Sequence, residues 1–149
     1  MSDKASIAVV GTGWWATTAH IPALIEHPRV GKIILVDHNP EAARAAAVKY
    51  NLPVAHCYTN ISEAKADHPD LQGAIIATTH HAHYPAAKDA LEAGLHLLLE
   101  KPMTIYAREA KALVDLAAAR NLKILMGYTF PYLPTVAQAK HYIDDGLIG

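Results

Sequence analysis

Five apolar runs of strand length recur along the chain, and the longer segments between them carry apolar residues three or four positions apart. This alternation is typical of a parallel sheet covered by helices. The runs lack polar alternation, as expected of strands buried on both faces. We therefore predict an α/β fold, a doubly wound parallel sheet (Rossmann fold) that forms a single domain over residues 1–149. The predicted strands are residues 7–10, 32–36, 73–77, 96–99 and 123–127, with a shorter candidate at 54–57.

Capping residues predict where the helices begin and end. Asn39 is a suitable N-cap, because Pro40 follows it at the first helical position, where a missing N–H does no harm. That helix should end near residues 51–53. Gly94 predicts a left-handed end for the next clear helix, and Pro22 predicts a kink or break around residues 20–21. Two more helices are expected at 106–120, with an apolar stripe at 106, 110, 113, 114 and 117, and at 134–145, before Gly146.

The first turn of the predicted sheet is rich in small residues. The order strand, Gly11-Thr12-Gly13-Trp14-Trp15-Ala16, helical segment places a G-x-G-x-x-A pattern where dinucleotide-binding folds carry it. Gly11 would allow the tight turn, Gly13 the approach of a pyrophosphate, and Ala16 close packing of helix on strand. The alternative is a plain structural turn. Trp14 and Trp15 either line a cofactor groove or pack against the helix start, and packing is the favoured interpretation.

Asp37 supplies a second element of a dinucleotide site. It ends the second predicted strand and follows Ala16 by 21 residues, near the spacing at which a carboxylate accepts hydrogen bonds from an adenosine ribose. A carboxylate there also repels a 2'-phosphate, so NAD is the expected cofactor, with NADP as the second choice. The alternative is an ordinary turn or capping role beside Asn39.

A lysine follows the predicted strand at 96–99. Lys101, between Glu100 and Pro102, lies just beyond the carboxyl end of that strand, the edge at which open parallel sheets bind ligands. Such a lysine can donate a hydrogen bond to a substrate hydroxyl and assist its proton movement during hydride transfer. Taken alone, a lysine at this position is more often a solvated surface charge.

Composition excludes several classes of partner. The 13 Lys and Arg residues nearly balance the 14 Asp and Glu residues, so no basic footprint for nucleic acid is present. No apolar run approaches the roughly 18 residues of a membrane span, so no membrane partner is expected. The expected location is cytoplasmic. A single cysteine, Cys57, excludes an internal disulfide and a thiolate metal cluster, and it is interpreted as a small apolar filler.

Four stretches together resemble the Gfo/Idh/MocA family of nicotinamide-dependent oxidoreductases, which includes glucose-fructose oxidoreductase and inositol dehydrogenase. They are "GTGWWA", "VDHNPEAARAAAVKY", "AIIATTHHAHYPAAKDALEAGLHLLLEKPMT" and "ILMGYTFPYLPTVAQAKHYIDDGLIG". The family's glycine motif falls on Gly11, Gly13 and Ala16, its second-strand acid on Asp37, and its Glu-Lys-Pro motif on residues 100–102.

The resemblance implies hydride transfer between a nicotinamide cofactor and a sugar-like or cyclitol alcohol. It implies that Lys101 contacts the substrate, that Pro102 shapes the bend near the nicotinamide, and that Thr78, His80 and His83 lie in the segment passing the cofactor. Many members have Pro, often followed by Asn, after the Thr of that segment, whereas this sequence has Thr79 and His80. The histidines of "HHAH" are interpreted as satisfied or exposed loop residues rather than metal ligands, and no metal is expected.

Family members carry a second domain that supplies further catalytic groups and most of the substrate pocket. This sequence resembles the N-terminal half, so we expect the second domain to be absent, through natural truncation or because the chain is a piece cut at the domain boundary. Alone, the chain is expected to be inactive. A non-catalytic dinucleotide-binding module, acting as a sensor or a partner-dependent subunit, is the alternative function, and a homo-oligomer is an assembly that the sequence leaves open.

Overall fold

A computed structural model describes residues 4–148 and contains a six-stranded sheet in which all neighbouring strands are parallel. The strand order is β3-β2-β1-β4-β5-β6, so the direction of winding reverses between β1 and β4. This order confirms the predicted doubly wound sheet. The strands are β1 (Ala5–Val10), β2 (Val30–Val36), β3 (Cys57–Tyr58), β4 (Leu71–Ile76), β5 (His96–Leu99) and β6 (Ile124–Met126).

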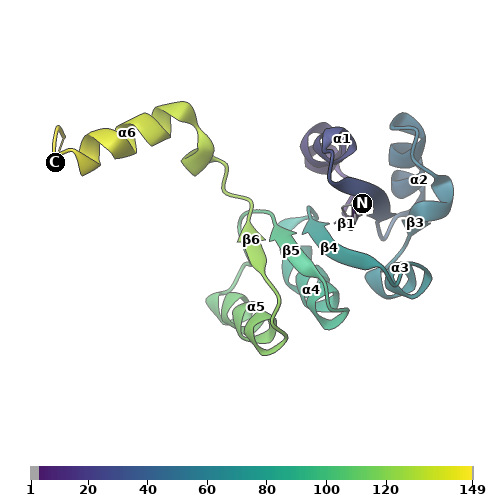
Figure 1. Ribbon diagram of the computed structural model, residues 1–149. Coiled ribbons are helices and arrows are strands. Elements are labelled where there is room, and N and C mark those ends of the chain that lie inside the picture. The colour runs from purple at the N-terminus through teal and green to yellow at the C-terminus, as the bar shows by residue number, and fades with distance from the viewer. Residues whose placement is uncertain (1–3, 149) are drawn as a thin grey trace.

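Helices cover both faces of the sheet (Figure 1). On one face lie α1 (Ile21–Glu26) and α2 (Pro40–Lys49), and on the other lie α3 (Ile61–Asp67), α4 (His80–Glu92) and α5 (Ala107–Ala119). The predicted caps of α2 and α4 are confirmed. The side chain of Asn39 accepts a hydrogen bond from the N–H of Glu41 at 3.1 Å, and Gly94 has a φ of 80°.

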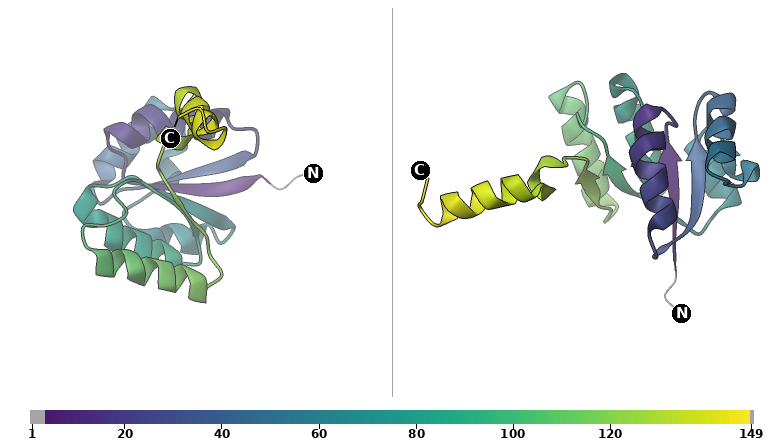
Figure 2. Two further views of the ribbon diagram at one scale, coloured as in Figure 1. Left: turned by 90° about the vertical axis from the view of Figure 1, so that its left-hand side faces the viewer. Right: turned by 90° about the horizontal axis from the view of Figure 1, so that it is seen from above.

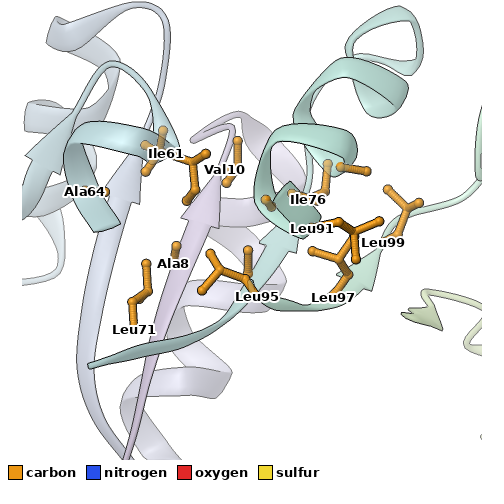
Figure 3. Packing of buried hydrophobic residues seen from close by; sticks show 14 of the residues in the cluster. Ala8, Val10, Ile61, Ala64, Leu71, Ile76, Leu91, Leu95, Leu97 and Leu99 are labelled. Carbon is orange, nitrogen blue, oxygen red and sulfur yellow. The ribbon is translucent and has the colours of Figure 1, made fainter. Parts of the chain in front are cut away.

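Successive residues of the central strands pack on opposite faces of the sheet, as the pleat requires. Val9 of β1 and Leu35 of β2 pack with the helices α1 and α2, whereas Ala8, Val10 and Ile34 belong to the cluster against α3, α4 and α5. The central strands are therefore buried on both faces, as their continuous apolar runs predict. Figure 3 shows the larger cluster, with Leu71, Ile76, Leu91, Leu95, Leu97 and Leu99 around Ala8 and Val10.

The region between β2 and β4 differs from the prediction. Residues Val54–His56 form a 3-10 helix (η2), and the short strand follows at Cys57–Tyr58 instead of covering 54–57. Helix α3 was not predicted, and its N-cap Asn60 accepts a hydrogen bond from the N–H of Glu63 at 2.9 Å. Cys57 packs against the smaller apolar cluster, and burial raises the pKa of its thiol, in agreement with a filler role.

The C-terminal part of the sheet is less buried than expected. Tyr106 is the N-cap of α5, and Val114 is 53% exposed, so both leave the predicted stripe. Leu113 and Ala117, also members of that stripe, are buried as predicted. Leu125 is 55% exposed, because β6 is the edge strand and one of its faces carries no helix in the described part of the chain.

The irregularity predicted at Pro22 is confirmed and takes the form of a π turn. Residues Ala16–His20 form a π-helix (η1) that runs directly into α1. The N–H of Ile21 donates to the carbonyl of Ala16, five residues earlier. Pro22 then stands in the first turn of α1, where its lack of an N–H is tolerated.

The last helix leaves the domain. A 3-10 turn, η3 (Phe130–Tyr132), and α6 (Pro134–Asp144) follow β6, and α6 has no buried residue. Figure 1 and the right-hand view of Figure 2 show α6 extending beyond the sheet rather than lying on it. The helix predicted at 134–145 is confirmed. Over residues 4–148, no helix combines the length and the hydropathy needed to span a membrane.

Candidate dinucleotide and substrate site

The residues singled out in the sequence meet at the carboxyl edge of the sheet. Gly11 follows β1, Asp37 follows β2, Thr78 comes two residues after β4, and Glu100 and Lys101 follow β5. Because every strand is parallel, these positions share one edge. The crevice beside the reversal of strand order, between β1 and β4, is where such sheets bind ligands.

The glycine loop has the geometry expected of a dinucleotide-binding turn. Gly11 has a φ of +87°, and a Cβ there would lie 2.8 Å from the carbonyl oxygen of Ala77, so only glycine fits. At Gly13 a Cβ would meet nothing within 4 Å, so the fold itself leaves open space above this residue. Ala16 is fully buried against β1 and β2.

Asp37 is tied to the glycine loop. Its Oδ2 accepts hydrogen bonds from the N–H and the hydroxyl of Thr12 at 2.7 and 2.8 Å, and its Oδ1 accepts from the N–H of Asn39 at 2.9 Å. Burial, the largest single influence, raises the pKa of the carboxyl, but these hydrogen bonds together outweigh it, so the pKa lies below its ordinary value. Asp37 is therefore a carboxylate at neutral pH.

The acceptor capacity left on Asp37 lies on one oxygen. A carboxylate oxygen accepts about two hydrogen bonds, and Thr12 supplies two to Oδ2. On Oδ1, Asn39 takes one position, and Nδ1 of the exposed His38 lies 3.2 Å away. Since the His38 side chain is 98% exposed, it can move aside for a ligand hydroxyl. The capping role and the ribose role proposed for Asp37 are therefore compatible.

A hollow of about 330 Å³ adjoins the glycine loop and contains the lysine. From the predicted set it is lined by Thr78, His80, His83, Glu100 and Lys101. Pro102, which follows a cis peptide bond, is exposed and does not line the hollow. The structure therefore brings the lysine and the segment after β4 to one place.

The two tryptophans stand where this hollow meets the crevice along the glycine loop. Trp14 and Trp15 line both, and the two ring centroids lie 5.6 Å apart. Trp14 is 74% exposed and Trp15 is 40% exposed. The favoured interpretation, packing against the helix start, is not supported for Trp14, because most of this residue is exposed. The groove interpretation agrees with this placement.

The histidines of "HHAH" occupy the first turn of α4, so the expectation of a loop is wrong. His80 and His81 are exposed, whereas His83 is 1% exposed. Its Nδ1 lies 2.6 Å from the carbonyl oxygen of Pro102. A helix forms here because Thr79 is extended and the next residues carry no breaker until Pro85. Over residues 4–148, no three His, Cys, Asp or Glu side chains are grouped as a metal site requires.

Several lining residues were missed by the sequence analysis. Gly127, Tyr128 and Thr129 line the hollow from the segment after β6, and Thr12 anchors Asp37. Their position just after a predicted strand was a usable signal, because the carboxyl ends of all parallel strands share this edge. His20, whose Nε2 lies 2.8 Å from a Glu100 oxygen, was also missed, and its placement depends on a backbone feature that the sequence does not show.

Comparisons with known proteins agree with the fold and the site. The family model of Gfo/Idh/MocA proteins, described as an oxidoreductase family with an NAD-binding Rossmann fold, matches residues 5–128. An uncharacterized oxidoreductase of Synechocystis sp. is 33% identical over 148 residues, which cover 99% of this chain and 39% of that protein. The levoglucosan dehydrogenase of Pseudarthrobacter phenanthrenivorans is 34% identical over 116 residues, which cover 78% of this chain and 29% of that enzyme.

A solved structure gives the same result for the fold. GenD2 from gentamicin A biosynthesis, in complex with NAD, matches with a TM-score of 0.87 at 28% identity. The match covers 97% of this chain and 40% of that one. The chain therefore spans less than half the length of each of these three similar proteins.

Proposed function

The chain belongs to the Gfo/Idh/MocA family of NAD-binding oxidoreductases, and from this premise we propose that it holds a nicotinamide dinucleotide at the carboxyl edge of its sheet. We further propose that Lys101 serves a hydride transfer between that cofactor and a sugar-like or cyclitol alcohol. The observation that carries the proposal is the continuity of the crevice along Gly13 and Asp37 with the hollow around Lys101, joined at Trp14 and Trp15.

The residues present fit such a cofactor. Gly11 sets the turn, and the open space above Gly13 lets a pyrophosphate approach the start of the first helix, where N–H groups are unpaired by helix geometry. Oδ1 of Asp37 is the oxygen that would accept a ribose hydroxyl. When bound, the cofactor would supply the hydride chemistry, and the residues of this chain orient it and handle the proton.

Lys101 is the proposed catalytic residue. It is the second residue after β5, it is exposed, and it lines the hollow. Its ammonium group can donate a hydrogen bond to the reacting oxygen of an alcohol or a carbonyl, and it can hold the proton that moves as that oxygen changes charge. A positioned acid or base contributes roughly 100 to 10,000-fold to such a reaction.

The substrate class is proposed from the lining and from the relatives. The hollow presents the exposed rings of Trp14 and Tyr128 beside the polar side chains of Thr78 and Lys101, a combination suited to the faces and hydroxyls of a sugar ring. One relative is named a levoglucosan dehydrogenase. Because the chain spans less than half of its relatives, we propose that turnover needs groups beyond these 149 residues. Orientation by such groups contributes about 7–11 kcal/mol to comparable barriers.

Two measurements test this function. Calorimetry with NAD should show binding to the 149-residue chain. Mixing the chain with NAD and a panel of sugars and polyols should leave the near-ultraviolet absorbance unchanged, because no reduced nicotinamide forms. A longer protein that adds a second domain should produce that absorbance, and Lys101→Met should then remove most of it while the affinity for NAD stays. Turnover by the short chain, or an active Lys101→Met enzyme, would contradict the proposal. NAD binding without turnover even in the longer protein would favour the non-catalytic module.

A further inference from the structure

The carboxylate of Glu100 is a buried acceptor shared by two ring N–H groups. Its Oε1 lies 2.7 Å from the indole Nε1 of Trp15 and 2.8 Å from Nε2 of His20, and its Oε2 lies 3.3 Å from the backbone N–H of Lys101. The side chain of Glu100 is 8% exposed and that of His20 is 15% exposed. Because carboxylate oxygens only accept, His20 carries a proton on Nε2 in this arrangement.

Trp15 and His20 reach the same oxygen because of the π turn. In an α-helix each residue turns by about 100°, so two residues five apart point about 140° away from each other. The bond from the N–H of Ile21 to the carbonyl of Ala16 closes a turn of five residues instead, which brings such a pair close to one face. The two rings also meet edge to face, with their centroids 6.2 Å apart.

Two other residues account for the π turn. The carbonyl of Thr17 would accept from Ile21 in an α-helix and from residue 22 in a π-helix. Ile21 is used by Ala16, and Pro22 has no N–H. The carbonyl of Thr17 instead accepts a hydrogen bond from the hydroxyl of Tyr50, at the end of α2. A partly buried carbonyl that would otherwise lack a protein partner is thus satisfied from outside the helix.

Gly127 makes room for the carboxylate. A Cβ at this position would lie 2.9 Å from the carboxyl carbon of Glu100. The carboxylate is therefore enclosed between the first helix, the end of β5 and the segment after β6. Its oxygens cannot easily turn toward another partner, and the indole of Trp15 is fixed with respect to the backbone of Lys101.

From this arrangement we infer that Glu100 and His20 act as positioning residues that hold the indole of Trp15 as a wall for the nicotinamide end of the cofactor. Asp37 marks the adenosine end of the crevice, and Lys101 marks the place of reaction. Trp15 lines both parts, so it stands where the nicotinamide must lie to face a substrate beside Lys101. This inference rests on the proposed function.

The test compares two ligands that differ only in the nicotinamide group. Calorimetry measures the affinity of the 149-residue chain for NAD and for ADP-ribose. In His20→Leu, the affinity for NAD should fall about tenfold, which corresponds to about 1.4 kcal/mol, while the affinity for ADP-ribose stays within about twofold. His20→Gln keeps an N–H donor near Oε1 of Glu100 and should therefore retain part of the NAD affinity that His20→Leu loses. A general loss of structure would lower the affinities for both ligands alike.

A second variant and a control distinguish a specific effect on the nicotinamide end from a general loss of the fold. Tyr50→Phe removes only the hydroxyl that satisfies Thr17, and it should shift the ratio of the two affinities in the same direction as His20→Leu. Both variants should also shift the tryptophan emission spectrum, because the indole of Trp15 is then held less firmly against the carboxylate of Glu100. His81→Leu, at an exposed position outside the pocket lining, should change neither ratio nor spectrum.

Two results would overturn the inference. The affinities for NAD and for ADP-ribose could fall equally in His20→Leu and in Tyr50→Phe. Glu100 and His20 would then support the fold without positioning the nicotinamide end, and the proposed function would stand. If the unaltered chain binds neither NAD nor ADP-ribose, the proposed function fails together with the inference.

Discussion

The Nδ1 of His83 lies 2.6 Å from the carbonyl oxygen of Pro102, which joins the first turn of α4 to the residue after Lys101. On the other side of the ring, Nε2 lies 3.3 Å from the carbonyl oxygen of Thr78. One buried imidazole thus links the segments that follow β4 and β5. Since the ring faces two acceptors, the shorter contact is the one to which it donates.

Replacing His83 should loosen this link. His83→Phe keeps a ring of similar size but leaves the carbonyl of Pro102 without its donor, so the free energy of unfolding should fall by about 1–3 kcal/mol. Denaturant unfolding measures this change. His81 is exposed and lies two residues before His83. In His81→Phe the free energy of unfolding should change by no more than about 0.5 kcal/mol. Equal effects of the two substitutions would show that the hydrogen bond of His83 adds nothing measurable.

The two glycines of the first turn should respond in opposite ways. Gly13→Val places its side chain in open space, so the melting temperature should change little while dinucleotide binding is lost. Gly11→Ala strains a backbone at positive φ and brings Cβ to 2.8 Å from a carbonyl oxygen, so it should destabilise the fold strongly. Thermal unfolding and calorimetry on both variants separate the two roles. Unchanged affinity in Gly13→Val would reduce this glycine to part of a turn.

Asp37 should make the chain prefer NAD. Its pKa is held below the ordinary value, so a 2'-phosphate would meet a carboxylate, and NAD should bind about tenfold or more tighter than NADP. Asp37→Asn removes the charge with little change of shape and should narrow that ratio. His38→Ala tests whether the exposed neighbour offsets the repulsion, and it should widen the ratio. Equal affinities for both cofactors in the unaltered chain would contradict this role of Asp37.

Asp70 should contribute stability that acid removes. The hydrogen bond from the Ser6 hydroxyl at 2.6 Å, followed by the contact with Lys32, lowers the pKa of Asp70 from 3.8 to about 2. A pKa depressed by folding adds stability above the unfolded value, and that stability is lost as pH falls through the folded value. Asp70→Asn should therefore be less stable than the unaltered chain at neutral pH.

The size and pH range of the Asp70 effect are both limited. Because the Asp70 side chain is 54% exposed, the difference should not exceed about 1 kcal/mol. Unfolding measured between neutral pH and pH 2 should show the difference shrinking over the interval from about 4 to about 2. A difference that stays constant through this interval would mean that the charge of Asp70 is not its cause.

Local signals in the sequence were sufficient for most of the fold. Continuous apolar runs revealed five of the six strands, and Asn39 and Gly94 marked helix ends because capping depends on neighbours within a few residues. The third strand has only two residues, too few for any pattern. The exposure of Leu125 could not be read, because a strand at the edge of a sheet has the same composition as one inside it.

Residues of the candidate site could be predicted from the sequence only where a known motif fixes their spacing. The positions of Gly11 and Asp37 at this edge of the sheet follow from their spacing along strands β1 and β2. The link between Trp15, His20 and Glu100 does not, because it depends on a π turn whose carbonyl is satisfied by Tyr50, 33 residues away. The helical start of "HHAH" was missed for a related reason, since the contact of His83 with Pro102 crosses 19 residues.

Helix α6 has 11 residues, none of them buried, and its main neighbour is the short turn η3. Isolated helices of this length are marginal in water. Within the 149-residue chain, its amide protons should therefore exchange with solvent orders of magnitude faster than those of β1 and β4, whose ladders are flanked on both sides. A protein surface that slows this exchange would be one that packs against α6, whether or not the dinucleotide site is filled.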